Sequence, residues 1–476
     1  MGSQGPSSAD FKSTFRIIIV GCGLAGLAAA IGIRRAGFQV LILEQAAEVK
    51  EVGAGIEIPS NASKVYKHWG ILDTVRNHSV QAPNIVLRSY RDGKVLSKAN
   101  LIPYCDSAYG SPHLDIHRAD LHSILMNEAI RLGAKIYLDS PVSRIDFTNM
   151  VVHLRCGDTF KAQIVLGADG DRSVCRELLL GHADPPGRSG DLGFRVVFEA
   201  EGLRQRGGTL MDLIEPPNIN AWFGPHSHVV SYLLKKDDLF NVFLGGPDFS
   251  TRNDPILGPQ EATMDELRAR FTDWDPRLRE LLEIAQKTRK WEMLSTGDLS
   301  TWTHENGRFT LLGDAAHGML PYLGQGAAMA MEDAGVLGRL FALSEHPAQL
   351  PDILTIYEHL RRPRTMEVKR RSKEMRATHG FPDGPVQEER DRQMALDPFE
   401  GYPNAWADPV FQKWLWGYDA VQEADQAWDV YKKGLFPGTR GAWKEPLKSL
   451  GSHGVNGVNG VNGVNGTKMT KQTVSI

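Results

Sequence analysis

A glycine-rich turn near the N-terminus has the spacing that holds the pyrophosphate of a dinucleotide. Gly21, Gly23 and Gly26 form the pattern G-x-G-x-x-G. In this pattern Gly21 permits a tight turn, Gly23 lets the backbone approach the phosphates, and Gly26 lets the following helix pack closely on the strand. The first helical turn, with Leu24 and Ala25, would offer free N–H groups and the positive end of the helix dipole. The spacing alone also occurs in ordinary glycine turns.

The elements around this turn have the pattern of a βαβ unit. Residues 16–20 and 39–43 are short apolar runs that predict parallel strands, and residues 24–36 predict a helix that ends at Gly37. Glu44 follows the second strand, where its carboxylate could accept hydrogen bonds from the ribose of a bound dinucleotide. These features predict a Rossmann-type nucleotide-binding domain, but they do not distinguish FAD from NAD.

Three strand-like runs in the middle of the chain predict a second domain. Residues 194–198, 229–234 and 240–244 follow one another closely, which favours an inserted antiparallel sheet. Helical patterns then return, including a basic stretch over residues 353–375 that Pro363 should kink or divide. We expect a flexible N-terminus (1–15), the first part of the nucleotide-binding domain (16–185), the sheet domain (186–295), the second part of the nucleotide-binding domain (296–380), a C-terminal helical and aromatic segment (381–450), and a disordered tail with Gly-Val-Asn repeats (451–476).

The composition limits the partners and the location that we expect. With 54 Lys and Arg against 57 Asp and Glu, the formal net charge of -3 favours neither nucleic acid nor an acidic membrane as a partner. The four cysteines form no C-x-x-C pair, and no His/Cys/Asp cluster has ligand spacing, so we expect reduced thiols and no metal. The chain has neither a secretory signal nor an apolar run of about 20 residues, so we expect a cytoplasmic protein, monomeric or weakly dimeric.

Further motifs, taken in order, resemble those of the single-component (group A) FAD-dependent aromatic hydroxylases, in particular the salicylate-hydroxylase-like members and their fungal relatives in secondary metabolism. The resemblance runs from about residue 17 to residue 420. It implies an α/β fold in which a Rossmann-type FAD-binding domain, like that of para-hydroxybenzoate hydroxylase, carries an inserted antiparallel-sheet substrate domain and C-terminal helices. The motifs are Glu44-Gln45, Gly53-Ala54-Gly55-Ile56 with Asn61, His117–Leu121, Gly167–Ser173, Gly313–His317, Pro321, Gly324-Gln325-Gly326, Glu332-Asp333-Ala334 and Trp414–Asp419.

The resemblance implies a tightly but non-covalently bound FAD and assigns residues to it. Arg118 should lie beside the pyrophosphate or the ribityl chain, and Asp314 should accept a hydrogen bond from a ribityl hydroxyl. A surface salt bridge for Arg118 and a simple helix cap for Asp314 are the alternatives. The backbone N–H groups of a helix that begins near Gly324 should face the flavin and stabilise negative charge on its reduced form. The other residues assigned to the cofactor are Gln45, Gly55, Glu57, Asp169, Pro321, Gln325, Gly326 and Ala327.

Two residues of the inserted domain are candidate catalytic groups. Arg195, on the first strand of the sheet, could fix a phenolate or carbonyl of the substrate, or donate a hydrogen bond to developing charge. An arginine paired across two domains is the alternative. Tyr232, on a neighbouring strand, could donate a phenol hydrogen bond in the same pocket, although a half-buried strand tyrosine would look the same. His317 is interpreted as a structural part of its turn rather than as a base.

The function expected from the resemblance is oxygenation. FAD reduced by NADPH or NADH would react with O2 to give a C4a-hydroperoxide, which passes one oxygen atom to an electron-rich aromatic or indole-type substrate by hydroxylation or epoxidation. The chain has no second G-x-G-x-x-G after a strand, so the nicotinamide cofactor should bind transiently. The Asp169-Gly170 stretch is linked in this family to both dinucleotides. An oxidase or dehydrogenase without oxygen insertion and a non-catalytic flavin-binding protein are the alternatives.

Overall fold

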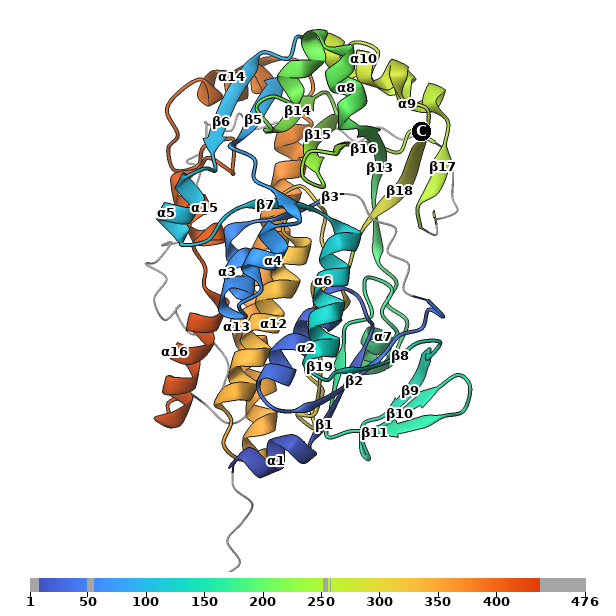
Figure 1. Cartoon of the computed structure of the whole chain (residues 1–476), viewed down its shortest axis with the longest axis vertical. Coiled ribbons are helices and arrows are strands. Elements are labelled where there is room, and N and C mark those ends of the chain that lie inside the picture. The colour runs from blue at the N-terminus through green and yellow to red at the C-terminus, as the bar shows by residue number, and fades with distance from the viewer. Residues whose placement is uncertain (1–7, 49–54, 251–255, 257, 437–476) are drawn as a thin grey trace, which may run out of the picture.

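A five-stranded parallel sheet forms the base of the molecule (Figure 1). The computed structural model describes residues 8–48, 55–250, 256 and 258–436. The strand order is β19-β12-β1-β2-β8, and every neighbouring pair is parallel. The first two strands have the predicted bounds, and the helix between them, α2 (Leu24–Arg35), is one residue shorter than predicted. The strands are β1 (Arg16–Val20), β2 (Gln39–Leu43), β8 (Lys135–Tyr137), β12 (Ile164–Gly167) and β19 (Phe309–Leu311).

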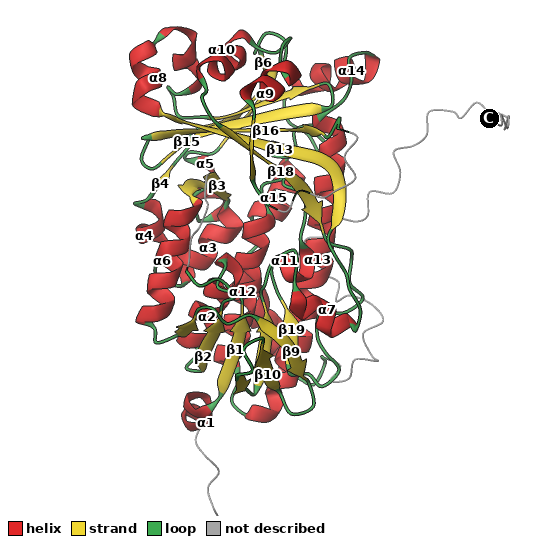
Figure 2. Ribbon diagram, turned by 90° about the vertical axis from the view of Figure 1, so that its right-hand side faces the viewer, coloured by secondary structure: helices red, strands yellow, loops and turns green. Residues whose placement is uncertain are grey.

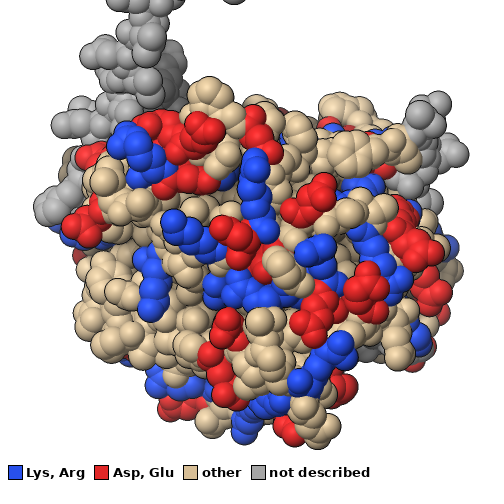
Figure 3. Space-filling view, turned by 90° about the horizontal axis from the view of Figure 1, so that it is seen from above, with Lys and Arg blue, Asp and Glu red and all other residues tan. Residues whose placement is uncertain are grey.

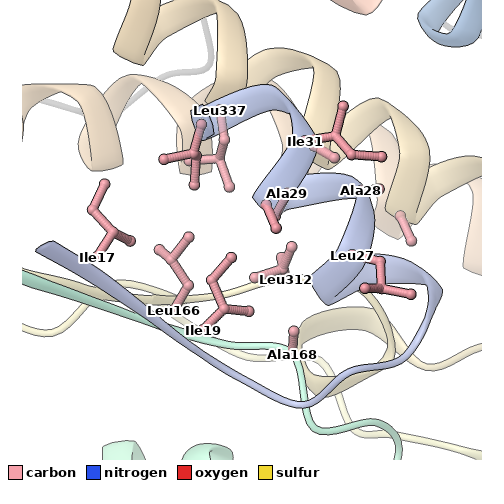
Figure 4. Close-up of a cluster of buried hydrophobic side chains, with 14 of the residues drawn as sticks. Ile17, Ile19, Leu27, Ala28, Ala29, Ile31, Leu166, Ala168, Leu312 and Leu337 are labelled. Carbon is pink, nitrogen blue, oxygen red and sulfur yellow. The ribbon is translucent and has the colours of Figure 1, made fainter. Parts of the chain in front are cut away.

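The core of this part lies between the parallel sheet and two helices. Helix α12 (Gly326–Leu343) crosses α2 so closely that a Cβ on Gly338 would lie 2.6 Å from the Cα of Gly32. Backbone contact at this crossing brings the apolar faces of both helices onto the strands, as the close-up in Figure 4 shows. The labelled side chains of this cluster are Ile17, Ile19, Leu27, Ala28, Ala29, Ile31, Leu166, Ala168, Leu312 and Leu337.

An eight-stranded mixed sheet forms the upper part of the molecule (Figure 2). Its order is β17-β18-β13-β16-β15-β14-β5-β6, and the three predicted runs lie in β13, β16 and β15. The strands are β5 (Asn84–Ser89), β6 (Val95–Asn100), β13 (Gly187–Glu199), β14 (Ile219–Gly224), β15 (Ser227–Leu234), β16 (Leu239–Pro247), β17 (Gln260–Ala262) and β18 (Thr288–Ser295).

Two expectations about this sheet were wrong. Strands β5 and β6 come from residues that the sequence placed in the first part of the nucleotide-binding domain (16–185), so the sheet domain is not one insertion of residues 186–295. The sheet is also not wholly antiparallel, because β14 pairs with β5 in parallel register. The run Ile85-Val86-Leu87 is apolar and buried throughout, so its pattern predicts a strand without indicating which sheet it joins.

Helices cover the outer face of the large sheet, as Figure 2 shows for α8 (Ala200–Arg206), α9 (Met264–Arg270) and α10 (Pro276–Ile284). Phe194 and Val196 of β13 belong to the hydrophobic core beneath these helices. Successive side chains of a strand point to opposite faces, so Arg195 points to the inner face of the sheet.

Two small antiparallel sheets and further helices connect the two parts. The sheets have the orders β3-β7-β4 and β11-β10-β9. Their strands are β3 (Gly55–Ile58), β4 (Ser79–Val80), β7 (Leu114–His117), β9 (Val142–Asp146), β10 (Val151–Leu154) and β11 (Thr159–Lys161). The helices are α3 (Ser60–His68), α4 (Leu72–Arg76), α5 (Tyr104–Tyr109), α6 (Arg118–Arg131), α7 (Val174–Leu180), α11 (Asp314–His317), α14 (Pro385–Met394), α15 (Pro409–Trp416) and α16 (Ala420–Lys432), with 3₁₀ turns at η1 (Gly208–Leu213) and η2 (Pro347–Gln349).

Helix α13 (Leu350–His379) runs from the lower part of the molecule to the large sheet (Figure 1). It contains Pro363 and is not divided there, contrary to one of the two outcomes that we expected. The buried arginines Arg361 and Arg364 flank the proline and form ion pairs with Glu332 of α12. We attribute the continuity of the helix to this packing, which offsets the hydrogen bond that proline removes.

The structure describes the N-terminal end of the chain from residue 8 and the C-terminal end up to residue 436. Residues 8–14 form helix α1, so the expected flexible N-terminus (1–15) is wrong for this stretch. Phe11 of α1 is buried and lies edge-on to Phe15 and Phe38, with ring centroids 5.5 and 5.8 Å away. The predicted Gly-Val-Asn tail lies outside the described residues, as do Gly53 and Ala54.

The surface and the helices limit the partners that the fold suggests. The face seen in Figure 3 carries basic and acidic side chains interspersed, without a broad field of one sign. Among the described helices, none has the length and apolar character needed to cross a bilayer. The described part of the chain also contains no group of three or more His, Cys, Asp or Glu side chains placed to hold a metal ion. All four cysteines are free thiols.

Candidate active site

A cavity of about 390 Å³ lies between the glycine turn of the parallel sheet and the inner face of the large sheet. It brings together residues that are hundreds of positions apart in the sequence. The predicted site residues that line it are Gly23, Leu24, Ala25, Gly55, Glu57, Arg118, Arg195, Tyr232, Asp314, Pro321, Gly324, Gln325, Gly326 and Ala327.

A second cavity of about 240 Å³ lies on the other side of the glycine turn. The predicted residues Gly21, Glu44, Gln45 and Asp169 line it, and Gly23 lines both cavities. Two cavities joined at a glycine turn match the shape of a dinucleotide whose pyrophosphate crosses the turn.

The three glycines of the turn differ in what surrounds them. Gly21 has φ +104°, and a Cβ there would lie 2.4 Å from the carbonyl oxygen of Ala168. A Cβ on Gly26 would lie 2.1 Å from the carbonyl oxygen of Gly21, and Gly26 lines neither cavity. A Cβ on Gly23 would meet no atom within 4 Å. Gly21 and Gly26 are therefore required by local packing, whereas Gly23 leaves the cavity side of the turn open for a ligand.

The carboxylates of the second cavity are held by backbone N–H groups. Glu44 accepts hydrogen bonds from the N–H groups of Cys22 and Ala46, at 2.8 and 2.9 Å. Asp169 accepts from the N–H of Cys175 at 3.0 Å and from the hydroxyl of Ser173. Both side chains are thus fixed beside the turn, where Glu44 could also meet a ribose hydroxyl.

The first cavity contains polar groups that suit a flavin with its ribityl chain. The side-chain Nε2 of Gln325 is buried and has no hydrogen-bond partner. Asp314 lines the cavity, and its side chain is exposed to the space inside it. The protein around the cavity shields the carboxylate from bulk solvent and so raises the pKa of Asp314. No side-chain cap is made at the start of α11, so Asp314 does not serve as the simple cap that was its alternative. The start of α12 at Gly326 also points free N–H groups at this region. These donors and acceptors fit FAD.

Arg195 of β13 and Tyr232 of β15 both line the cavity from the inner face of the large sheet, but β16 lies between these two strands, which were predicted to be neighbours. The guanidinium of Arg195 lies 5.1 Å from the ring centroid of Trp291, and its Nε has no hydrogen-bond partner. Burial lowers the pKa of Arg195. The Tyr232 ring is buried against Gly55, where a Cβ would lie 2.3 Å from its Cε2. Gly55 is thus needed for the tyrosine as well as for the cavity.

A pair of acidic residues on β3 and β7 lies at the cavity wall, which Glu57 lines. Glu57 and Asp115 are directly opposite each other in the antiparallel register, and Nε2 of His113 lies 3.7 Å from Oε2 of Glu57. Asp115 is fully buried, and neither of its oxygens has a hydrogen-bond partner. Burial and the nearby Glu57 raise the pKa of Asp115 well above its ordinary value, so its neutral form is favoured.

Replacing Asp115 with asparagine is expected to change how stability depends on pH. A raised native pKa gives stability that is complete below the unfolded-state pKa and is lost as pH rises through the native pKa. Asp115→Asn should therefore resemble the parent protein in acid and become relatively more stable as pH rises. Thermal unfolding of both proteins over a pH series measures the difference, and a difference that stays constant with pH would show that Asp115 is ionised in the folded protein.

A buried ion-pair network supports the turn that carries Asp314. Asp333 accepts hydrogen bonds from Nε2 of His317 at 2.6 Å, from the N–H of Gly313 at 3.0 Å and from Nε of Arg361 at 2.8 Å. Glu332 pairs with both Arg361 and Arg364. His317 therefore has a structural role in this turn, as predicted, and the Glu332-Asp333-Ala334 motif anchors the turn to α13.

Sequence reasoning missed much of the substrate side of the cavity. These residues come from β15, β16, β18, the segment between α11 and α12, the end of α13 and the loop before α15, and no single local motif links them. Strand alternation could have found Phe243 once its strand was recognised, because it lies opposite Arg195 in the register. The missed lining residues are His228, Val230, Phe243, Trp291, Met319, Tyr322, His379 and Trp406.

Comparison with known proteins gives a consistent picture. A family model described as FAD binding domain matches residues 14–372. The chain is 36% identical to the FAD-dependent monooxygenase OpS4 of Beauveria bassiana, over 88% of this chain and 98% of that protein. It is 34% identical to 6-hydroxynicotinate 3-monooxygenase of Bordetella bronchiseptica, over 75% of this chain and 90% of that protein. A solved salicylate hydroxylase substrate complex superposes with a TM-score of 0.72 and 25% identity, over 87% of this chain and 98% of that one.

Proposed function

Because the chain belongs to the FAD-binding domain family and is an FAD-dependent monooxygenase, we propose that it transfers one oxygen atom from O2 to an aromatic or indole-type substrate held beneath the large sheet. The observation that carries the proposal is the continuous cavity, which joins the glycine turn and the start of α12 to an inner sheet face lined by aromatic side chains. A relative that acts on 6-hydroxynicotinate and a neighbour solved as salicylate hydroxylase support an aromatic substrate.

The proposed reaction balances with NAD(P)H as reductant, which is general in this family. NAD(P)H, a proton, O2 and substrate give NAD(P)⁺, water and a product with one more oxygen atom. FAD, when bound, supplies the two-electron chemistry between the nicotinamide and O2. The chain would hold it with the residues of the two cavities, chiefly Gly23, Glu44, Arg118, Asp314 and Gln325. We extend the proposal to a role in natural-product biosynthesis, in a cytoplasmic protein that is monomeric or weakly dimeric.

In this proposal the large sheet orients the substrate and excludes water. Trp291 and Phe243 offer apolar faces to an aromatic ring. Arg195 has no acidic partner among the described side chains, so its charge is available to a substrate oxygen that gains negative charge during the reaction. The Tyr232 hydroxyl would donate a hydrogen bond on the same face. Burial keeps this phenol protonated, because it raises the pKa of Tyr232 well above its ordinary value.

Spectroscopy and product analysis test the proposal together. Purified protein should show flavin absorbance that bleaches when NAD(P)H is added without air and returns with O2. With a panel of phenols and indoles, mass spectrometry should find a product heavier by one oxygen atom. Release of hydrogen peroxide alone with every compound would favour an oxidase, and flavin that NAD(P)H cannot reduce would favour a non-catalytic flavin-binding protein.

Replacing Arg195 with methionine is expected to slow product formation by about 100-fold, the effect of removing one donor to a developing negative charge. FAD binding should not change, and NAD(P)H oxidation should yield peroxide instead of product. Arg206→Met is the matched control, because Arg206 lies on α8 with a side chain that is half exposed. Normal product yield per NAD(P)H in Arg195→Met would remove the proposed role of Arg195.

A further inference from the structure

Two buried histidines line the cavity at a distance from Tyr232. His228 and Tyr232 both lie on the inner face of β15, four residues apart, which separates their Cα atoms by about 13 Å along the strand. His379 is the last residue of α13 and is 1% exposed. Its ring stacks on Phe223 with centroids 3.8 Å apart, and its centroid lies 5.4 Å from that of His228. The cavity thus has a tyrosine end and a histidine end.

The register of the large sheet places Arg195 between these ends. Arg195 is opposite Phe243, and Phe243 is opposite Val230, which lies midway between His228 and Tyr232. In the next row towards the histidines the paired residue is Gly245, where a Cβ would lie 2.4 Å from Cε1 of His228. A glycine is therefore needed for the imidazole to occupy its place. The inner face of the sheet therefore leaves space for the His228 imidazole as well as for the Arg195 side chain.

Both imidazoles are neutral at physiological pH. Burial lowers the pKa of His228 to about 4, and burial together with His228 and Arg390 lowers that of His379 well below its ordinary value. Asp191 is the acid that faces His228. Its carboxylate already accepts hydrogen bonds from the Tyr322 hydroxyl and the Arg376 guanidinium, each at 2.6 Å. Asp191 therefore already has hydrogen-bond partners other than His228. Neither imidazole at the histidine end carries a positive charge.

His379 has unused hydrogen-bonding capacity inside this end. Neither of its ring nitrogens has a hydrogen-bond partner, and both are buried. A neutral imidazole has one N–H donor and one acceptor nitrogen. Leaving a buried polar group without a partner is unfavourable, and a ligand that supplies the partner would recover this loss. Trp406 and Tyr322 flank the His379 ring, with centroids 5.7 Å away in each case, so the surroundings favour a flat ligand.

We propose that His379, with His228 beside it, recognises a neutral carbonyl or amide group at the end of the aromatic substrate away from Tyr232. This inference rests on the proposed function and narrows its substrate class to aromatic compounds with two separated polar ends. The oxygen of the ring to be modified meets Arg195 and Tyr232, while an uncharged acceptor or donor meets His379. A carboxylate at the histidine end is disfavoured, because no charged partner there is free to compensate its desolvation.

A pair of matched phenols tests this assignment. 4-Hydroxyacetophenone and 4-isopropylphenol have similar shapes. The ketone has a carbonyl oxygen where 4-isopropylphenol has a second methyl group. Each is titrated into the FAD-bound enzyme, with the change in flavin absorbance as the readout. A thermal-shift titration of the apoprotein provides a second readout that needs no flavin. We expect the ketone to bind about tenfold more tightly, which corresponds to one recovered buried hydrogen bond.

Variants at position 379 separate recognition from packing. His379→Phe keeps a ring that can stack on Phe223 and should reduce the preference for the ketone to less than about threefold, whereas His379→Gln should restore most of it. His182→Phe is the matched control, since His182 is exposed and lines neither cavity of the site. A tenfold preference that survives in His379→Phe, or failure of both phenols to perturb either readout, would overturn the assignment.

The pH dependence distinguishes a neutral imidazole from a charged one. Between pH 5.5 and 7 the affinity for 4-hydroxyacetophenone should stay constant. Tighter binding of 4-hydroxybenzoate as pH falls, lost in His379→Phe, would mean that a protonated imidazole binds carboxylates, and it would contradict the proposal. None of these binding measurements requires turnover, so failure to oxygenate any phenol would count against the proposed function alone.

Discussion

Replacing Arg361 with methionine is expected to lower the free energy of unfolding by about 3 to 5 kcal/mol, because it removes the cation that two buried acids share and leaves Asp333 without its arginine. The side chains of Arg361, Glu332 and Asp333 are fully buried. Methionine nearly matches arginine in the length of its apolar stem, so the change removes charge and hydrogen bonds more than volume. Urea unfolding followed by tryptophan fluorescence measures the loss.

Arg370→Met on the same helix is the matched control. The side chain of Arg370 is half exposed and pairs with Glu367 and Glu374 on the surface. Exposed pairs of this kind contribute about 0 to 1 kcal/mol, so the control should be almost neutral. Equal effects of the two substitutions would show that the buried network adds nothing beyond helix packing.

The network also predicts a dependence on acid. Burial opposes ionisation of Asp333, but His317 and Arg361 beside it hold its pKa at about 2. A lowered native pKa gives stability that is present above the unfolded-state pKa and is lost as pH falls through the native value. The parent protein should therefore lose stability between about pH 4 and pH 2. Arg361→Met should show a weaker loss over that range, since its Asp333 is already less stabilised as the anion.

The nucleotide-binding half of the fold could be predicted because its signals are local. The strands around Gly21, the helix between them and the acid at Glu44 all lie within one βαβ unit. Gly21 and Gly26 have steric requirements that the pattern already states, such as the contact between Gly26 and the carbonyl of Gly21. The residues of the distant motifs, including Asp314 and Gln325, followed from resemblance, and the cavities now bring them beside the turn.

The substrate half depended on pairings that no local pattern contains. Strand β5 joins β14 more than a hundred residues away, and the side of the cavity is completed by His379 from the end of a long helix. Alternation along β13 could separate Arg195 from Phe194 but could not tell which face has helices over it. Helix α1 was missed for the same reason, because Phe11 becomes a core residue only through its contact with Phe38.

Replacing Asp314 with alanine is expected to weaken FAD binding by about 10- to 100-fold, the range for losing a hydrogen bond to a charged group. Asp314 follows Gly313 and lies three residues after β19 ends at Leu311, so the parallel sheet fixes its position in the cavity. Its carboxylate accepts no hydrogen bond from the described residues, and the polar partner that it lacks is one that a ribityl hydroxyl would provide. Equilibrium dialysis or quenching of flavin fluorescence on titration of the apoprotein measures the affinity.

The same substitution should leave the apoprotein almost as stable as the parent, because the side chain is exposed to the cavity and supports no other residue. Surface changes of this kind usually stay within about 0.5 kcal/mol. This separates a ligand contact from a structural one, since a structural acid would lose stability and cofactor together. Asp425→Ala on the surface of α16 controls for the loss of one negative charge. Full FAD affinity in Asp314→Ala would refute the contact, and equal loss of FAD in both variants would point to net charge as the cause.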